Sequence, residues 1–323
     1  MSGDVIAPRR AWLAGLLSVP FPGVGQLYAG QPAAAFFTSG VMSTSLLLAI
    51  LAGSYWPRHL VVAVWVGLAI FLLTWFGQFV HAIVAAVRAG PGYRLQPYNR
   101  FLVYFIFTVV ISQGANLVGS AVRGLIAEPF FVPAQNMEPT LKTGDHLYAL
   151  KMGDFSRPVR GAIVVYVAPG FEGQPNQFRV GRLVGLPGET IEIVDAGVVV
   201  NGHPLPRSAC PQPEYAYEVQ YVADQPVRLR RGQCVLESGA IVYATLLNPE
   251  GEGDRFRSSP PMTLGETQYF VMGDNRDDSV DSREFGALPA DHIVGRMAGV
   301  HFSYSPIRGI QFERFGFDPN KSL

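Results

Sequence analysis

Residues 101–119, with the sequence FLVYFIFTVVISQGANLVG, form an apolar run that contains no charged side chain. A helix of about 20 residues crosses a bilayer core of about 30 Å, so this run is long enough to span a membrane. Two further runs of this kind precede it, Ala33–Gly53 and Leu60–Val87. After Phe130 the helical periodicity disappears. The sequence therefore predicts a helical membrane anchor followed by a domain of a different class.

The composition excludes several classes of protein. Of 323 residues, 49% are hydrophobic and only 15% are charged, which does not fit a coiled coil or an extended disordered chain. Residues 1–127 hold seven Arg, no Lys and one acidic residue, a formal charge of +6, which leaves −6 for the remainder. These arginines stand singly beside apolar runs and form no basic patch, so nucleic-acid binding is not predicted.

The arginines also predict the topology. Arg88, Arg94 and Arg100 lie between the second and third runs, and positive charge near span ends is held in the cytoplasm. Residues after about 125 are then predicted to lie on the side of the membrane opposite the cytoplasm. Trp12–Tyr28 is interrupted by proline and glycine and is expected to form a re-entrant or interfacial hairpin, which gives three spans. Four spans with an external N-terminus are the alternative.

The polar half is predicted to be all-β. Short β-branched or aromatic runs alternate with turn signals such as Asn201-Gly202. We expect a membrane region over residues 1–125, a β core over 126–203 and 262–310, an inserted β subdomain over 204–261 and a tail over 311–323. The predicted strands are Gly161–Val167, Thr190–Val194, Val198–Val200, Val235–Leu236, Ile241–Leu247 and Gln268–Met272.

The two cysteines, Cys210 and Cys234, lie in the predicted insertion and fit no zinc-binding pattern. Their spacing leaves open whether they form a disulfide, because pairing depends on the compartment and on the distance between their Cα atoms. No metal or cofactor is predicted.

Three motifs carry a resemblance to a known family. The first is Pro133–Leu141, PAQNMEPTL, followed by Gly144-Asp145; the second is Arg182–Glu189, RLVGLPGE; the third is Gly273–Gly286, GDNRDDSVDSREFG. In order and spacing they resemble the signatures of bacterial type I signal peptidases, membrane-bound serine proteases that remove signal peptides. The resemblance spans about residues 97–305. It implies a β domain of the signal-peptidase type that faces the periplasm or the exterior.

The residues that carry the family's chemistry are replaced. The resemblance places the nucleophilic serine at Asn136, the lysine base at Gly181 and an oxyanion-hole hydroxyl at Ala134. An amide is no nucleophile at neutral pH, and glycine cannot accept a proton. Restoring activity is therefore expected to need Asn136→Ser, Gly181→Lys and Ala134→Ser together, since residues that act as a unit are non-additive.

The remaining motif residues are assigned to the groove and its support. The resemblance implies that Ser279 and Asp281 would orient the family's lysine. The full set predicted to line or support a substrate groove is Pro133, Met137, Pro139, Asp274, Arg276, Ser279, Asp281 and Arg283. Thr140 and His146 lie close to residue 136 in the sequence and are the candidates for a substitute hydroxyl–imidazole pair.

Three functions remain open at this point. The favoured one is a catalytically inactive, signal peptidase I-like protein of the export pathway that binds signal peptides, preproteins or other extended segments, or assists an active paralogue. Family members bind the segment before the cleavage site as an added strand, and backbone pairing requires neither serine nor lysine. The alternatives are an active processing protease with unconventional residues and a non-enzymatic, membrane-tethered interaction module.

Overall fold

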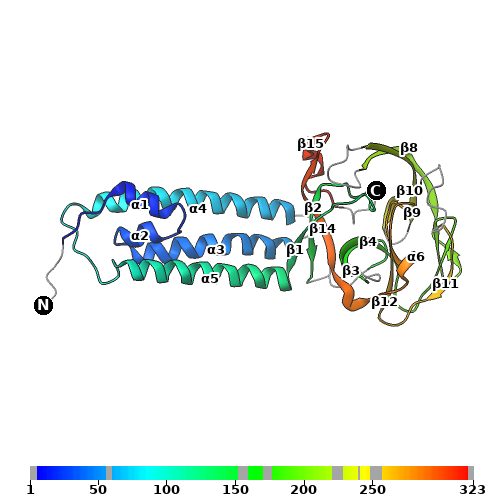
Figure 1. The fold of residues 1–323 in the computed structure, drawn as a ribbon, viewed down its shortest axis with the longest axis horizontal. Helices are drawn as coiled ribbons and strands as arrows, with labels where there is room; N and C mark the ends of the chain where they lie inside the picture. The colour runs from blue at the N-terminus through cyan, green and yellow to red at the C-terminus, as the bar shows by residue number, and fades with distance from the viewer. Residues whose placement is uncertain are drawn as a thin grey trace. The chain divides into compact units, whose positions relative to one another are not determined.

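The structure is a computed structural model that describes residues 6–55, 60–151, 159–169, 177–219, 228–238, 241–247 and 257–318. It divides into two compact units, Met1–Gly124 and Leu125–Leu323. The first is helical and the second is built of β-strands (Figure 1).

Five helices lie within the described residues of the helical unit. They are α1 (Ala11–Ser18), α2 (Val24–Tyr28), α3 (Pro32–Tyr55), α4 (Leu60–Ala89) and α5 (Phe101–Leu125). Within the described residues, two of them are long and apolar enough to cross a membrane, over Trp65–Ala89 and Phe101–Leu125. The predicted span at Ala33–Gly53 coincides with α3, but the side chains of its second half lie outside the described residues.

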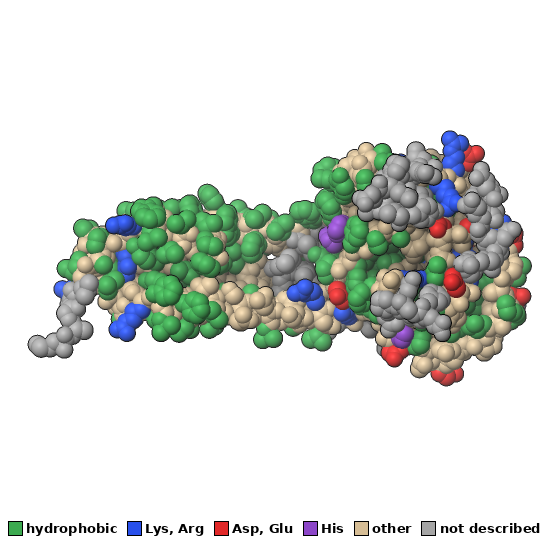
Figure 2. Space-filling model, in the orientation of Figure 1, with side chains coloured by type: hydrophobic (Ala, Val, Ile, Leu, Met, Phe, Trp, Pro, Cys, Tyr) green, Lys and Arg blue, Asp and Glu red, His purple; other side chains and the backbone are tan. Residues whose placement is uncertain are grey.

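Apolar side chains cover the visible surface of this unit, as Figure 2 shows. Phe37, Leu73 and Phe101 are among them, each more than 70% exposed. Such a surface is unfavourable in water and suits a hydrocarbon environment, because apolar side chains lose nothing by contacting lipid.

The break between α1 and α2 is held by Gln78 of α4. The Gly23 N–H donates to Oε1 of Gln78 at 3.0 Å, and Nε2 of Gln78 donates to the carbonyl of Ser18 at 3.1 Å. Nε2 of Gln26 donates to the backbone carbonyl of Gln78 at 2.8 Å. These bonds satisfy backbone groups that Pro20 and Pro22 leave without helical partners. With eight and five residues, α1 and α2 are each too short to span a bilayer.

The β unit is organised around one large antiparallel sheet with the strand order β1-β2-β14-β3-β4-β12-β13, in which β15 pairs with β14 (Figure 1). Its strands are β1 (Ala127–Phe131), β2 (Asp145–Leu150), β3 (Ile163–Ala168), β4 (Gln177–Gly185), β12 (Gln268–Met272), β13 (Leu288–Pro289), β14 (Ile293–Ser305) and β15 (Gly309–Ile310). The short helix α6 (Ser282–Phe285) precedes β13, and the 3-10 turns Ala290–His292 and Phe312–Arg314 flank β14 and β15.

Two smaller sheets complete the unit. One has the order β11-β5-β6-β7, and the other has the order β10-β9-β8. Within the second, Cys210 of β8 and Cys234 of β9 form a disulfide with a Cα–Cα distance of 5.6 Å. The strands are β5 (Thr190–Val194), β6 (Gly197–Val200), β7 (His203–Pro204), β8 (Arg207–Val219), β9 (Arg228–Ser238), β10 (Val242–Leu247) and β11 (Ser259–Thr263).

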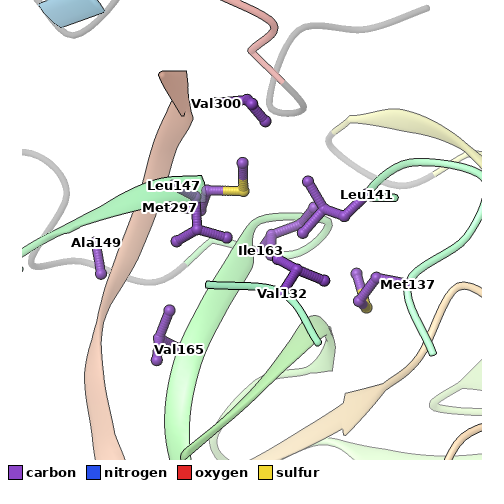
Figure 3. Close-up of a cluster of buried hydrophobic side chains, with 9 residues drawn as sticks. All are labelled: Val132, Met137, Leu141, Leu147, Ala149, Ile163, Val165, Met297 and Val300. Carbon is purple, nitrogen blue, oxygen red and sulfur yellow. The ribbon is translucent and has the colours of Figure 1, made fainter. Parts of the chain in front are cut away.

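A buried apolar cluster lies behind the first motif (Figure 3). Met137 and Leu141 of the motif pack there with Leu147, Ile163 and other side chains of β2, β3 and β14, and these four are fully buried. Burial of an aliphatic side chain of this size contributes roughly 1.5–3 kcal/mol. The motif is therefore fixed to the sheet by its own apolar residues.

The predicted strands match observed ones, and Thr190–Val194 and Gln268–Met272 agree to the residue. The sequence analysis named no strand at β1, β2, β4, β7, β8, β11, β13, β14 or β15. β4 and β14 contain glycine and arginine and bury several consecutive residues, so the alternation of apolar and polar side chains is weak in both.

Candidate functional site

The first motif forms a turn between β1 and β2. The Glu138 N–H donates to the carbonyl of Gln135 at 3.0 Å, and the Leu141 N–H donates to that of Met137 at 2.9 Å. Met137 points into the core, whereas Pro133 and Asn136 line a surface groove and Pro139 lines a second cavity. Of the eight residues predicted to line or support the groove, Pro133 is the one that lines it.

Asn136 occupies the position at which the family resemblance expects the nucleophile. Its Nδ2 donates to the carbonyl oxygen of Val180 in β4 at 2.9 Å. Its own carbonyl accepts a hydrogen bond from the Asn275 N–H at 3.1 Å. Asn136 thus connects the first motif to β4 through its side chain and to the third motif through its backbone.

Gly181 lies in β4, and the space beside it is filled by Tyr166 of β3. A Cβ atom at Gly181 would lie 3.1 Å from Cε1 and 3.6 Å from the hydroxyl oxygen of Tyr166. Val164 is paired with Gly181 and Tyr166 with Arg179, so Tyr166 and Gly181 are diagonal neighbours in the antiparallel ladder. Tyr166 is only 1% exposed, and burial raises the pKa of its phenol, with the nearby Asp281 acting in the same direction. Tyr166 therefore stays protonated at neutral pH.

Sequence reasoning missed Tyr166. Its only signal was membership of the apolar run Gly161–Val167, which indicated a strand and said nothing about what its side chain contacts. The contact exists because β3 and β4 pair in one particular register.

Arg182 and Asp274 form a fully buried ion pair. Nε and Nη2 of Arg182 donate to the two carboxylate oxygens of Asp274 at 2.7 and 2.6 Å, and neither side chain is exposed. The hydroxyl of Thr140 also donates to Asp274, at 2.5 Å. This bidentate geometry makes Asp274 the structural counter-ion of Arg182.

The considered pair of Thr140 and His146 is not formed. The Thr140 hydroxyl donates to Asp274, while the His146 ring packs against Phe131 and Phe302, with centroids 5.0 and 5.4 Å away. His146 lies on β2, beside β14, whereas Thr140 lies in the turn before β2. An imidazole in that position does not activate the hydroxyl.

The third motif is held together by Asp281. Its carboxylate accepts from the backbone N–H of Arg283 at 3.2 Å, which caps α6, and from the Gly273 N–H at 2.9 Å. The Arg283 guanidinium pairs with the same carboxylate at 2.8 Å. Gly273 tolerates no side chain, since a Cβ there would lie 2.3 Å from the Ser279 hydroxyl and 2.5 Å from the carbonyl of Asn136. Ser279, Asp281 and Asn136 are thereby brought together around Gly273.

Arg276 of the third motif is bound by the predicted insertion. Nη2 of Arg276 pairs with Glu237 of β9 at 2.5 Å, and the hydroxyl of Tyr243 in β10 donates to the same carboxylate at 2.8 Å. Arg276 also donates to the carbonyls of Ala196 and Gly273. Burial opposes ionisation of Glu237, but the Arg276 charge and these hydrogen bonds prevail and lower its pKa. The sequence reading did not predict this partner.

A second contact between the insertion and the first motif involves Glu138. Tyr215 of β8 donates its hydroxyl to Oε2 of Glu138 at 2.9 Å. Glu138 is 3% exposed, and this burial raises its pKa to about 7 although the Tyr215 hydrogen bond opposes the shift. A glutamate in such a site exchanges its proton near neutral pH.

The groove has a volume of about 420 Å³ and runs between the first motif and β4. Its two walls touch at two points. The Phe130 and Phe178 rings lie 5.4 Å apart, and Asn136 reaches Val180 as described above. The residues lining the groove are Phe130–Asn136, Val165, Gln177–Val180, Asp278 and Val280.

A larger cavity of about 620 Å³ lies on the other side of the first motif, where Pro139 and Thr140 meet β8, β9 and β10. The disulfide, Tyr215 and Tyr243 form part of its wall. Among the described residues, no group of three His, Cys, Asp or Glu side chains is arranged to hold a metal ion.

Comparison with known proteins places the chain in a family. The family model for signal peptidases, "Signal peptidase, peptidase S26", matches residues 100–302, which is more than half of the chain. The chain therefore belongs to the signal peptidase S26 family, and the predicted fold class of an apolar helical anchor followed by a β domain of this type is confirmed.

The most similar relatives include signal peptidase I of Rickettsia typhi (strain ATCC VR-144 / Wilmington). It is 28% identical over 223 residues, which cover 61% of this chain and 78% of the relative. Signal peptidase I of Rickettsia conorii (strain ATCC VR-613 / Malish 7) is 28% identical over 208 residues, covering 56% and 74%. A crystal structure of a signal peptidase I from Enterococcus faecalis V583 is 27% identical and covers 44% of this chain and 98% of that one, with a TM-score of 0.25.

Proposed function

We propose that this chain is a signal peptidase-like membrane protein without peptidase activity that binds signal peptides or other extended segments in its groove. The proposal rests on the groups found at residues 136 and 181, the two positions where the resemblance expects the family's catalytic serine and lysine. At residue 181 the space for a side chain is filled by Tyr166, and at residue 136 a carboxamide is hydrogen-bonded to β4. Neither group acts as a nucleophile or as a base at neutral pH.

The lysines of the chain support the same conclusion. The sequence has three, Lys142, Lys151 and Lys321, and none of them follows the strand that supplies the family's base. Lys151 pairs with Glu128 at 2.9 Å, and Lys142 lines a small cavity beside Glu138. Lys321 lies outside the described residues. Arg182 is no substitute base, because a guanidinium carries only donors, and its Nε and Nη2 bind the Asp274 carboxylate.

Peptide binding is supported by the groove itself. β4 pairs with β3 from Gln177 to Arg182 but with β12 only from Arg182 to Gly185, so among the described strands none pairs with the second edge of residues 177–181. An extended peptide binds at such an edge by backbone hydrogen bonds, and this interaction does not depend on a serine or a lysine.

The test uses the purified full chain in detergent and one preprotein. We expect no cleavage of the preprotein at its signal-peptide site, together with photo-crosslinking of a signal peptide to groove residues such as Phe178. A Val180→Pro variant lacks the N–H of residue 180 and so disrupts the open edge. If it crosslinks to the signal peptide as strongly as the wild type does, binding by strand addition is contradicted.

An active protease with unconventional residues is the second candidate, because Thr140 presents a hydroxyl to a carboxylate. Specific processing of the preprotein that is lost in Thr140→Ala would support this candidate and overturn the proposed inactivity. A chain that neither cleaves nor crosslinks would favour the third candidate, a membrane-tethered interaction module.

We also propose that the β unit lies outside the cytoplasmic membrane and that an active signal peptidase paralogue is a partner. The first point is supported by three arginines: Arg88 in the last turn of α4, and Arg94 and Arg100 between α4 and α5. Reporter fusions at residues 95 and 200 are expected to report opposite sides of the membrane. Cytoplasmic activity at residue 200 would overturn both the topology and the binding of exported signal peptides.

A further inference from the structure

The orientation of the Asn136 carboxamide is fixed by its partner. A backbone carbonyl only accepts hydrogen bonds, so the atom of Asn136 that faces Val180 is the donor Nδ2. The acceptor Oδ1 then lies on the other branch of the planar amide. Within the described part of the chain, no group donates a hydrogen bond to Oδ1. Asn136 lines the groove and is only partly buried, so this acceptor is available to a ligand.

Val180 shows which atoms of β4 face the groove. Since its carbonyl accepts from Asn136, the polar backbone atoms of Val180 point to the open edge of the strand. Backbone groups alternate in direction along a strand, so those of Phe178 point to the same edge and those of Arg179 to β3. An added segment therefore meets the backbone of two residues, one of which has its carbonyl already engaged by Asn136.

We propose that Asn136 is a ligand-contacting residue that extends the open edge of β4: its Nδ2 remains on the Val180 carbonyl, and its Oδ1 accepts one backbone N–H of the bound segment. This inference rests on the proposed function of the groove. It names the ligand as an extended peptide with a free N–H at the residue that lies against Asn136. Proline or an N-methylated residue at that place is excluded.

The chemistry explains why a carboxamide suits this position. It is the side-chain group that carries a donor and an acceptor in the geometry of a peptide bond, so it continues the alternation of a strand edge. Aspartate has nearly the same shape but only acceptors when ionised, and it would face the Val180 carbonyl with a negative charge. Alanine supplies neither group.

The experiment measures fluorescence anisotropy with the full chain in detergent. The probe is a fluorescein-labelled ten-residue peptide containing an Ala-x-Ala sequence, together with a set of the same peptide N-methylated at one residue at a time. One lost hydrogen bond that leaves a partner unsatisfied is expected to weaken binding roughly 10- to 100-fold. We expect this loss for Asn136→Ala and for Asn136→Asp, and for one or two N-methylated peptides on the wild-type chain.

Asn201→Gly is the matched control. Its side chain bonds the Thr190 N–H outside the groove, and its φ of 50° is accepted by glycine. This variant should bind the probe as the wild type does. The N-methylated peptides test the inference on the wild-type chain, so a variant that folds poorly does not decide the result.

Two outcomes overturn the inference, and they are distinguishable. If neither Asn136→Ala nor any N-methylation changes the affinity for the probe, the proposed role of Asn136 is refuted, while the proposed peptide binding stands. Failure of the wild-type chain to bind any peptide of the set would refute both.

Discussion

Residues 136 and 181, where the resemblance expects the family's serine and lysine, lie next to the third motif. The two regions differ in what holds their side chains in place. Asn136 and Gly181 carry groups without the family's chemistry, and Tyr166 fills the space beside Gly181. In the third motif Asp274, Arg276 and Asp281 are each buried and paired with a charged partner. The third motif is therefore fixed by buried ion pairs, whereas residue 136 is held by hydrogen bonds and residue 181 packs against Tyr166.

The largest expected effect tests the structural role of the third motif. Asp274→Ala would leave Arg182 buried without a counter-ion, and the loss of one partner of a buried pair costs roughly 3–5 kcal/mol. Denaturant unfolding of the purified chain, followed by the fluorescence of the β unit, measures this change. The matched control is Glu128→Gln, which breaks the partly exposed pair with Lys151 and is expected to cost under about 1 kcal/mol. Equal effects of the two variants would contradict the structural role of Asp274.

The next effect concerns Glu138, which connects the first motif to the insertion. Its pKa in the folded chain is about 7, above the ordinary value of 4.5, so the folded state holds the proton more tightly than the unfolded state. Its contribution to stability is therefore full below about pH 4.5 and is lost as the pH rises through 7. The difference is up to roughly 3 kcal/mol, taking 1.36 kcal/mol for each pKa unit.

Unfolding curves between pH 5 and 8 measure this dependence. Glu138→Gln removes the titrating group and keeps an acceptor for the Tyr215 hydroxyl, so this variant should lose less stability than the wild type between pH 5 and 8. The exposed Glu266 provides the control, since Glu266→Gln should leave the pH dependence as it is in the wild type. If Glu138→Gln shows the same pH dependence of unfolding as the wild type, Glu138 is not the group that titrates.

The smallest expected effect sharpens the comparison at the dyad positions. The sequence alone suggests that Asn136→Ser, Gly181→Lys and Ala134→Ser together restore cleavage. The structure adds an obstacle, because a lysine at residue 181 would have to share the space of the Tyr166 ring. We expect the triple variant to cleave at a barely measurable rate and the addition of Tyr166→Val to raise that rate about a hundredfold.

Preprotein cleavage followed across pH measures this restoration. The rate should rise with pH and then saturate as the introduced lysine loses its proton. If the triple variant cleaves as fast as the quadruple variant, Tyr166 does not block a lysine at residue 181.

Much of the architecture could be predicted from the sequence. The lengths of Leu60–Val87 and Phe101–Gly119 predicted α4 and α5, and β-branched runs bounded by turns predicted β3, β5, β6 and β12. The three motifs predicted the family. These signals are local, since the length of an apolar run and the period of side-chain alternation are fixed by neighbouring residues.

The strands β2 and β14 could not be predicted in this way. Charged, polar and glycine residues interrupt their alternation, and their burial depends on pairing with each other across more than 140 residues of sequence. The placement of Met137 in the core and of Pro139 on a second cavity also follows from how the turn is packed.

The sequence by itself determined which chemical groups stand at residues 136 and 181, and hence that serine and lysine are absent there. Only the tertiary structure decided what surrounds them. Asn136 meets Val180 across 44 residues, Arg276 meets Glu237 across 39, and Glu138 meets Tyr215 across 77. Tyr166 lies beside Gly181 because β3 and β4 pair in one register. Shifting that register by one residue would turn Tyr166 to the other face of the sheet relative to Gly181, and no local pattern in either strand specifies which register forms.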